Sequence, residues 1–514
     1  MMDLVNPPSD APIDSTLSVA ESSGLERAWI VVPLALAALV YFPLIHNFFF
    51  AGDFHNFYLF RNDGLLEFLI APHGGHLLMT RNFIWWLLYQ LAGMHSEVYF
   101  ATVLVSHLVA VGLLFEAARR LTRSAAAACV AASLWGSTAV QEGTLGWYSV
   151  YGQVLATAIL AWLLYRLART AEEGSPLTSA VVLRWVFLIL AALTSFGVGI
   201  GIALVFPVVA YLMLPPSRAR TRAVIAFAVL AVLVPAFYRT MLLLYETLYG
   251  PSKELGMVYV GLRLPMTVLK LFAYLIGDGI TALVGAGLAA PGTIPSIAVG
   301  ALATAYLLVL LVVFYNSAAR DRRLLVAGTI LCFACYGLIA LGRAPYCLQG
   351  QVELVAHATR YHYAATLPLA LLTAVALARL GAWMRPSPAV VGASVATFVG
   401  VLTFCQLRWG PEIDHHAIAL RETSATVAAI RKAIDAAPTD KDVYIENRRF
   451  ISIGPMLNRR MDIFPGWAGV FVIYFPDNVV DGRQVHFVSA PEVVAAMRRG
   501  TRAASLLVTP ERRR

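Results

Sequence analysis

The sequence has 514 residues, of which 59% are hydrophobic and only 13% are charged. Soluble domains usually have about a quarter of their residues charged, so this composition excludes an ordinary soluble enzyme and indicates a polytopic membrane protein. The formal net charge of +9 does not indicate nucleic-acid binding, because the basic residues cluster in short loops between apolar runs. The five cysteines lie mostly inside apolar runs, which favours small buried side chains over a metal or redox site.

Residues 1–27 are polar and rich in Ser, Pro and Asp, and predict a disordered cytoplasmic tail. The apolar runs that follow are long enough to cross a bilayer core of about 30 Å. We expect a helical polytopic domain over 28–407, with about eleven spans. They lie at 28–47, 97–117, 125–141, 150–169, 181–196, 199–215, 222–243, 297–316, 324–342, 362–380 and 388–407.

Arginines recur in every second short connection, for example at 119–123, 218–222 and 320–323. Basic short loops stay in the cytoplasm, so this pattern predicts a cytoplasmic N-terminus and a C-terminus on the other side. One more span at the apolar stretch 264–290 would place the later basic loops outside the cytoplasm, so this stretch is predicted not to be a full span. We interpret it as membrane-surface or re-entrant helices within an external loop, 244–296.

The remaining segment, 408–514, has an ordinary charged composition and no span. It predicts a small external α/β domain. We expect helices at 417–436 and 491–500 and strands at 442–446, 469–475 and 484–488.

The first external loop, 48–96, concentrates ionisable residues beside the bilayer. Such groups are costly there unless they are used, so this loop is the first active-site hypothesis. Its candidates are Asp53, His55, Asp63, Glu67, His73, His76 and Arg81. Asp63 and Glu67 are four residues apart and share a helix face, which is also typical of a solvated surface.

The chain contains no GxxxxGK[ST] motif for ATP binding, no HExxH motif of zinc proteases and no GxSxG motif of serine hydrolases. None of these three activities is therefore indicated. A carboxylate just after the first span, with arginines in other external loops, suits transfer of a group from a lipid-linked phosphate. The carboxylate can deprotonate an attacking hydroxyl, and arginines can neutralise the departing phosphate. Nucleotide sugars are not expected outside the cytoplasm, so a donor there would be carried on a lipid.

Five segments together resemble the GT-C class of integral-membrane glycosyltransferases, which includes the protein O-mannosyltransferase and aminoarabinose-transferase branches. They are GDF at 52–54, PHGGHLLMTRNFIWWLLYQLAG at 72–93, and the segments 143–169, 192–214 and 359–372. The chain departs from many members in having one acidic residue at Asp53, where two adjacent acids are common.

The resemblance implies an inverting hexosyl- or pentosyltransferase that uses a polyprenyl-phosphate donor. The acceptor would be an external cell-envelope glycan, lipid or protein. Asp53 would be the general base or position the acceptor, although an Asp can also cap a helix that begins near Phe54. Arg360 and Tyr361 would bind the donor phosphate, with Arg343 and Lys270 beside them. The alternative for these residues is a plain contact with lipid headgroups.

Further substrate contacts are expected from His55, His73, His76, Arg81, Glu67, Trp147 and Tyr151. The histidines can equally hydrogen-bond within the loop, Arg81 can snorkel to the headgroups, and Trp and Tyr are common in interfacial belts. His357 and His362 are weaker candidates. No cofactor is expected, because two histidines without a fixed carboxylate are a weak metal signal, though a divalent metal is not excluded.

The predicted location is the bacterial inner membrane, with the C-terminal domain in the periplasm. The predicted partners are a polyprenyl-phosphate sugar, an external acceptor and membrane lipids, and no nucleic acid. A transporter or flippase is an alternative, but it would predict mid-span charges and an internal repeat, and neither is evident here. A glycan ligase or polymerase, or a non-catalytic assembly protein, also stays open.

Overall fold

The computed structural model describes residues 24–49, 53, 56–57, 64–73, 76–250, 260–285, 295–347, 351–409, 442–446, 479–480, 483–488 and 503–507. The long helices are α2 Val31–Tyr41, α5 Met79–Ala92, α6 Ser96–Thr122, α7 Ala125–Ser137, α9 Tyr151–Glu173, α10 Ser179–Leu193, α11 Val198–Met213, α12 Arg218–Tyr249, α14 Pro265–Val284, α15 Ser296–Tyr315, α16 Ala319–Arg343, α18 Tyr363–Met384 and α19 Pro388–Trp409. Short elements are α1 Gly24–Ala28, η1 Phe42–His46, α4 Leu65–Ile70, β1 Pro72–His73, β2 His76–Leu77, η2 Ala139–Gln141, α8 Glu142–Leu145, η3 Tyr148–Val150, η5 Ala344–Cys347, α17 Val352–Ala356 and η6 Thr359–Tyr361.

The predicted helical polytopic architecture is confirmed. A helix occupies each of the eleven expected spans. Among the described residues, nine helices are long and apolar enough to cross a membrane by length and composition, and α7, α10 and α11 are shorter apolar helices. α10 and α11 are short because the chain turns between them at 194–197, where both helices are buried.

The twelfth apolar helix is α14, in the stretch that the sequence places at the membrane surface. By length and composition it is one of the nine candidates. Its side chains contact Phe333, Glu353 and His357. Its last turn accepts a hydrogen bond from Thr138 at the end of α7. The membrane-surface interpretation stays a prediction.

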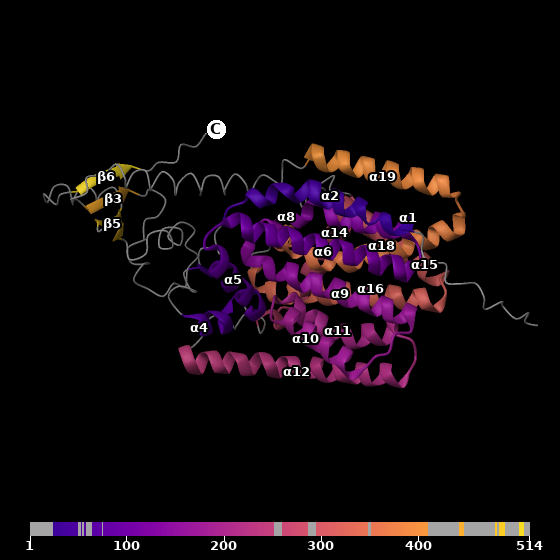
Figure 1. The fold of residues 1–514 in the computed structure, drawn as a ribbon, viewed down its shortest axis with the longest axis horizontal. Coiled ribbons are helices and arrows are strands. Elements are labelled where there is room, and N and C mark those ends of the chain that lie inside the picture. Colours follow the sequence, from indigo (N-terminus) through magenta and orange to yellow (C-terminus); the bar gives the residue numbers. More distant parts are fainter. Residues whose placement is uncertain are drawn as a thin grey trace, which may run out of the picture.

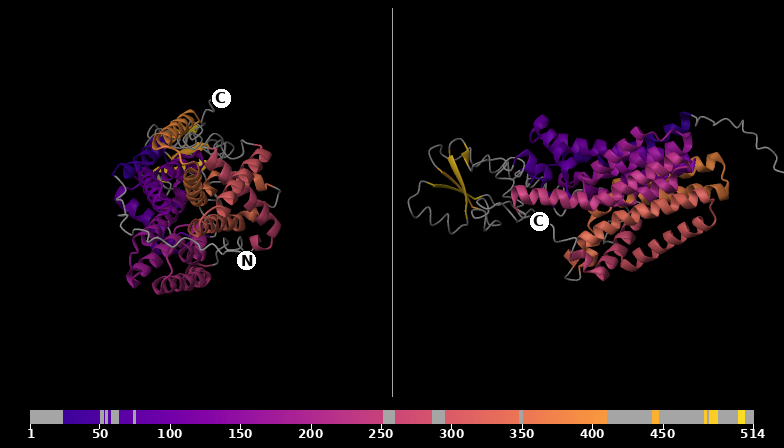
Figure 2. Two further views of the ribbon diagram at one scale, coloured as in Figure 1. Left: turned by 90° about the vertical axis from the view of Figure 1, so that its right-hand side faces the viewer. Right: turned by 90° about the horizontal axis from the view of Figure 1, so that it is seen from below.

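The helices form one elongated bundle, which Figure 2 shows along its long axis and from below. α12 and α19 lie on opposite outer sides in Figure 1. These outer helices expose large apolar side chains, such as Val232 on α12, which is 77% exposed. Apolar side chains on an outer surface suit contact with lipid tails, whereas the backbone polar groups are satisfied within each helix.

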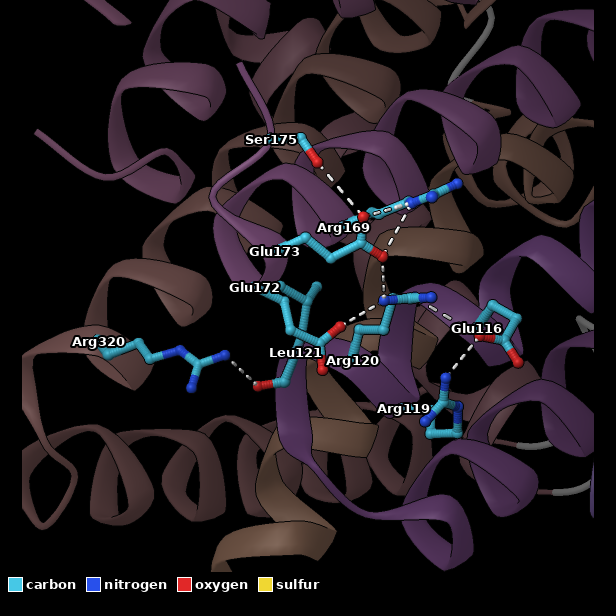
Figure 3. Close-up of polar contacts among 9 residues, drawn as sticks. All are labelled: Glu116, Arg119, Arg120, Leu121, Arg169, Glu172, Glu173, Ser175 and Arg320. Carbon is cyan, nitrogen blue, oxygen red and sulfur yellow. Dashed lines mark hydrogen bonds and ion pairs between the residues drawn. The ribbon is translucent and has the colours of Figure 1, made fainter. Parts of the chain in front are cut away.

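α4 and α5 lie at one end of the bundle and α1 at the other (Figure 1). We call the end with α4 and α5 the loop end, and the end with α1 the arginine end. The arginine end is held by charge pairs between α6 and α9 (Figure 3). Arg120 bonds to Glu172 at 2.5 Å and Glu173 at 3.2 Å, and Arg320 at the start of α16 donates to the carbonyl of Leu121. Such a network holds helix ends together better than isolated surface pairs do.

The described C-terminal strands form one sheet in the order β4-β5-β3-β6. β3 Asp442–Glu446 pairs in parallel with both β5 Arg483–Val488 and β6 Ala503–Leu507, and β4 is Val479–Val480. Strands therefore form at 442–446 and 484–488, as predicted, and β6 was not predicted. Parallel neighbours need long crossover connections, which is typical of α/β domains. The expected elements at 417–436, 469–475 and 491–500 lie outside the described residues.

Close helix packing at Gly152 gives a first prediction. A methyl group there would overlap with the backbone carbonyl of Ser195, which cannot rotate away. Overpacking of this kind costs about 1–3 kcal/mol. We expect Gly152→Ala to lower the Tm of the purified protein in detergent. The control is Gly112→Ala, whose methyl would meet only the side chains of Ile30 and Leu34 at 3.7 and 3.9 Å. Equal Tm values for the two variants would contradict this packing.

Candidate functional site

Asp53 is held by a residue far away in the sequence. Its side chain is fully buried, and Oδ1 accepts hydrogen bonds from the backbone N–H and the hydroxyl of Ser149, both at 2.6 Å. Hydrogen bonds to the carboxylate favour its ionised form. Asp53 thus ties the first long loop to the loop that leads into α9. Phe54, where a capped helix was considered, lies outside the described residues.

Arg81 holds the same segment from the other side. Nη1 donates to the carbonyl of Ser149 at 2.8 Å, Nη2 to Asn56 at 2.8 Å and Nε to Asn82 at 2.9 Å. The guanidinium also lies over the ring of Trp85, 5.0 Å from its centroid. Arg81 is fully buried, so the idea that it snorkels to the headgroups is wrong. Its predicted contact with substrate stays a prediction.

The histidine-containing loop folds back as a hairpin, β1–β2, in which His73 pairs with His76. The ring of His76 lies 4.9 Å from the ring of Phe196. A Cβ at Gly197 would overlap with the His76 ring, so the glycine allows this close approach. Burial, and then the charges of Arg343 and Arg81, lower the pKa of His76 to about 3. His76 is therefore neutral at physiological pH and contributes no positive charge to a phosphate site.

A second group of residues combines cations with aromatic rings, and we call it the arginine–aromatic cluster. It consists of Arg343, Arg360, Trp147, Tyr346 and Tyr361. Arg343 lies 5.3 and 5.5 Å from the ring centroids of Tyr346 and Tyr361. Arg360 lies 5.7 and 4.9 Å from those of Trp147 and Tyr361. Within the described parts of the chain, neither arginine has a carboxylate partner.

The backbone of Arg360 is fixed by α8. A Cβ at Gly143 would overlap with Thr359 Oγ1 and lie 2.9 Å from the amide nitrogen of Arg360. The hydroxyl of Thr144 donates to the carbonyl of Arg360 at 3.2 Å. The 143–169 and 359–372 segments that the sequence singled out therefore meet at this point.

The segment 147–149 connects the two groups. Trp147 packs on Arg360, while Ser149 binds Asp53. Two residues separate their Cα atoms by at most about 7 Å. The carboxylate and the arginine–aromatic cluster are thus attached to one short stretch of backbone. It lies between the end of α8 and the start of α9.

The other candidates are placed as follows. Lys270 and Arg263 are exposed, on and just before α14. Glu67 is buried in α4, whereas its expected partner Asp63 and the candidate His55 lie outside the described residues. Tyr151 is buried against Tyr148 and shares a hydrogen bond with Ser106. Tyr151 is the first residue of α9, and its predicted contact with substrate stays a prediction.

The sequence indicated His357 as a weaker candidate but did not pair it with Asp278. Asp278 of α14 is buried, and its Oδ2 lies 2.8 Å from Nδ1 of His357. A carboxylate inside an apolar helix could have signalled this, because such residues need a partner. Asn56, Ser149 and Gly143 were also missed, since their roles depend on contacts between distant segments. In the described ranges no group of three His, Cys, Asp or Glu side chains could hold a metal ion.

No family model matches the chain, and no curated protein matches it either. Several solved structures are similar to it, and two of them are as follows. ArnT from Cupriavidus metallidurans, bound to undecaprenyl phosphate, has a TM-score of 0.47 and 13% identity, over 93% of this chain and 89% of that one. The Archaeoglobus fulgidus oligosaccharyltransferase, tethered to an acceptor peptide, has a TM-score of 0.44 and 14% identity. This chain covers 64% of its length, with 90% of the present chain aligned.

The buried position of Arg81 gives a second prediction. Arg81→Lys keeps the charge but cannot donate to Ser149, Asn56 and Asn82 together, because an ammonium lacks the planar fork of donors. Leaving buried acceptors unsatisfied costs about 1–3 kcal/mol each. We expect a clearly lower Tm in detergent. Arg239→Lys on the exposed surface of α12 is the matched control and should keep the wild-type Tm. A wild-type Tm for Arg81→Lys would show that these bonds are not needed.

Proposed function

We propose that this protein is a membrane glycosyltransferase that moves a sugar from a polyprenyl-phosphate donor to an acceptor outside the cytoplasm. The observation that carries the proposal is the arginine–aromatic cluster, joined through segment 147–149 to the buried carboxylate of Asp53. The arginine–aromatic cluster can bind an anion, and the carboxylate of Asp53 can accept a proton. Transfer of a sugar from a phosphate to a hydroxyl needs both functions.

The two arginines suit the donor phosphate. Arg343 and Arg360 both lie against the ring of Tyr361, which fixes the direction of their guanidinium groups. Among the described residues no carboxylate competes for them. Charged groups that are partly removed from water are costly without a partner. A phosphate would supply that partner through charge-assisted, bidentate hydrogen bonds, which strengthen as charge develops on the leaving group.

Asp53 suits the acceptor side of the reaction. Ser149 fixes one carboxylate oxygen, so the orientation of the group is set before substrate binds. In the proposed step, the acceptor hydroxyl attacks the anomeric carbon and passes its proton to Asp53. The bond from that carbon to the phosphate oxygen breaks, and polyprenyl phosphate leaves with the electron pair. Attack opposite the leaving phosphate inverts the anomeric centre.

The surroundings suit a lipid substrate. α12 and α15 expose apolar side chains along which a polyprenyl tail can lie. Lys270 and Arg263 are exposed near α14 and would contact headgroup phosphates. We assign sugar or acceptor contacts to His73, Glu67 and Trp147 and propose no bound cofactor. We place the enzyme in the bacterial inner membrane, with the N-terminus cytoplasmic, the C-terminal domain periplasmic, and a cell-envelope glycan, lipid or protein as acceptor.

The first functional prediction concerns Asp53. Asp53→Asn keeps an oxygen that can accept from Ser149 but removes the basic group. We expect release of polyprenyl phosphate, from a panel of polyprenyl-phosphate sugars in lipid, to fall at least about 100-fold, as for loss of a general base. Donor binding should persist. Turnover that survives Asp53→Asn would place the base elsewhere and favour a ligase or polymerase.

The second concerns the geometry of Arg360. Gly143→Ala would push Thr359 and Arg360 away from α8. We expect the KM for the donor to rise about tenfold or more, as for loss of a charge-assisted contact worth about 1.5–3 kcal/mol. The control is Gly342→Ala, beside Arg343, where an added methyl meets nothing within 4 Å. Unchanged donor KM in Gly143→Ala would separate Arg360 from donor binding.

A further inference from the structure

The pair formed by Asp278 and His357 lies outside the machinery assigned so far. Asp278 is buried between two glycines of α14, and its described partner is His357 Nδ1 at 2.8 Å. The side chain of His357 is 25% exposed, so the pair reaches from the bundle interior toward solvent. A buried carboxylate in an apolar helix is expensive, which favours a functional reason for keeping it.

A network of hydrogen bonds holds His357 in place. His362 Nε2 lies 2.9 Å from the carbonyl of Ala356, the residue before His357. A carbonyl only accepts, so this nitrogen carries the proton, and the hydroxyl of Tyr336 donates to His362 Nδ1 at 3.0 Å. A Cβ at Gly279 would overlap with that hydroxyl, so the glycine brings α14 and Asp278 close to the network.

The orientation of the ring leaves one nitrogen available. His357 Nδ1 donates to the carboxylate of Asp278, which directs Nε2 away from it. In the described part of the chain, the ring of His357 has no other hydrogen-bond partner, and its backbone N–H donates to the carbonyl of Glu353 at 2.9 Å.

The position of the pair connects it to the proposed donor site. His357 and Arg360 are three residues apart on one loop, so their Cα atoms lie within about 11 Å. Tyr336 and Arg343 lie seven residues apart on α16. Tyr336 bonds to His362 in the network around the pair, whereas Arg343 belongs to the arginine–aromatic cluster. The pair and the cluster therefore share two segments, α16 and the loop that holds His357 and Arg360.

We propose that His357 is a catalytic proton donor to the departing phosphate and that Asp278 is its positioning residue; this inference rests on the proposed function. As the bond between the anomeric carbon and the phosphate oxygen breaks, the electron pair moves to the phosphate. Nε2 of the imidazolium then gives its proton to a phosphate oxygen, which yields monoprotonated polyprenyl phosphate and neutral His357. Water restores the proton through the exposed edge of the ring.

An imidazolium is a suitable proton donor to a phosphate monoester. A phosphate monoester has a second pKa of about 6, and a histidine changes charge between about pH 5 and 8, so the proton can pass in either direction near neutrality. Other titratable and charged groups lie on the elements that pack around the pair. They are Tyr274 and Asp278 on α14, Glu353 on α17, Arg360 and His362 around η6, and Tyr336 and Arg343 on α16.

The test compares His357→Gln and Asp278→Asn with wild type, and His95→Gln in the exposed turn before α6 is the matched control. Donor turnover and binding of polyprenyl phosphate alone are both measured from pH 5 to pH 9. We expect wild-type kcat to fall as pH rises and the imidazolium is lost. His357→Gln should lower kcat about 100-fold and remove this fall. Asp278→Asn should shift the fall to lower pH, which a purely structural residue would not do.

The outcomes distinguish failure of the His357 proposal from failure of the glycosyltransferase proposal. Wild-type turnover with an unchanged pH profile in both variants overturns the role of His357 and leaves the glycosyltransferase proposal intact. Binding of polyprenyl phosphate that weakens with rising pH only when His357 is present, without turnover of any donor, keeps the phosphate site and overturns the transferase. Absence of both binding and turnover in wild type overturns both. If His357→Gln fails to fold, the shifted profile of Asp278→Asn decides alone.

Discussion

The arrangement of the site depends on how Ser149 is held. Its amide and hydroxyl donate to Asp53, and its carbonyl accepts from Arg81, so all three of its polar groups are committed. Two opposite charges are thereby buried on either side of one residue, and each offsets the cost of burying the other. This fixes the backbone on which Trp147 sits, and Trp147 in turn packs on Arg360. Loss of the Ser149 anchor would loosen both halves of the proposed chemistry.

Glycine determines how closely the other segments approach. Gly143, Gly197 and Gly279 each occupy a position where a methyl group would overlap with a residue of the site. Small residues at helix contacts are typical of membrane bundles, because close backbone packing replaces the missing hydrophobic driving force between helices. Here the same device places Thr359, the ring of His76 and the hydroxyl of Tyr336. Packing and chemistry therefore constrain the same positions.

The helical architecture was predictable because bilayer thickness fixes the length of an apolar run, and all eleven expected spans contain a helix. Asp53 was predictable as a candidate because a carboxylate beside the bilayer needs a reason. Its hydrogen-bond partner could not be predicted, because Ser149 is 96 residues away and only the packing of the fold brings the two together. Asp278 was missed for a related reason: a single acid in an apolar stretch carries no information about the histidine that it meets across the fold.

The buried carboxylates of Asp53 and Asp278 differ in their partners, and this difference separates their proposed roles. Asp53 accepts hydrogen bonds from the amide and the hydroxyl of Ser149, which favour a carboxylate that can take a proton. Asp278 instead faces the imidazole of His357, and an imidazole is a group that can donate a proton in catalysis. Pairs of titratable groups in contrasting environments are how a site supplies an acid and a base at the same pH. The arginine–aromatic cluster provides the fixed positive charge for the phosphate that the two groups would serve.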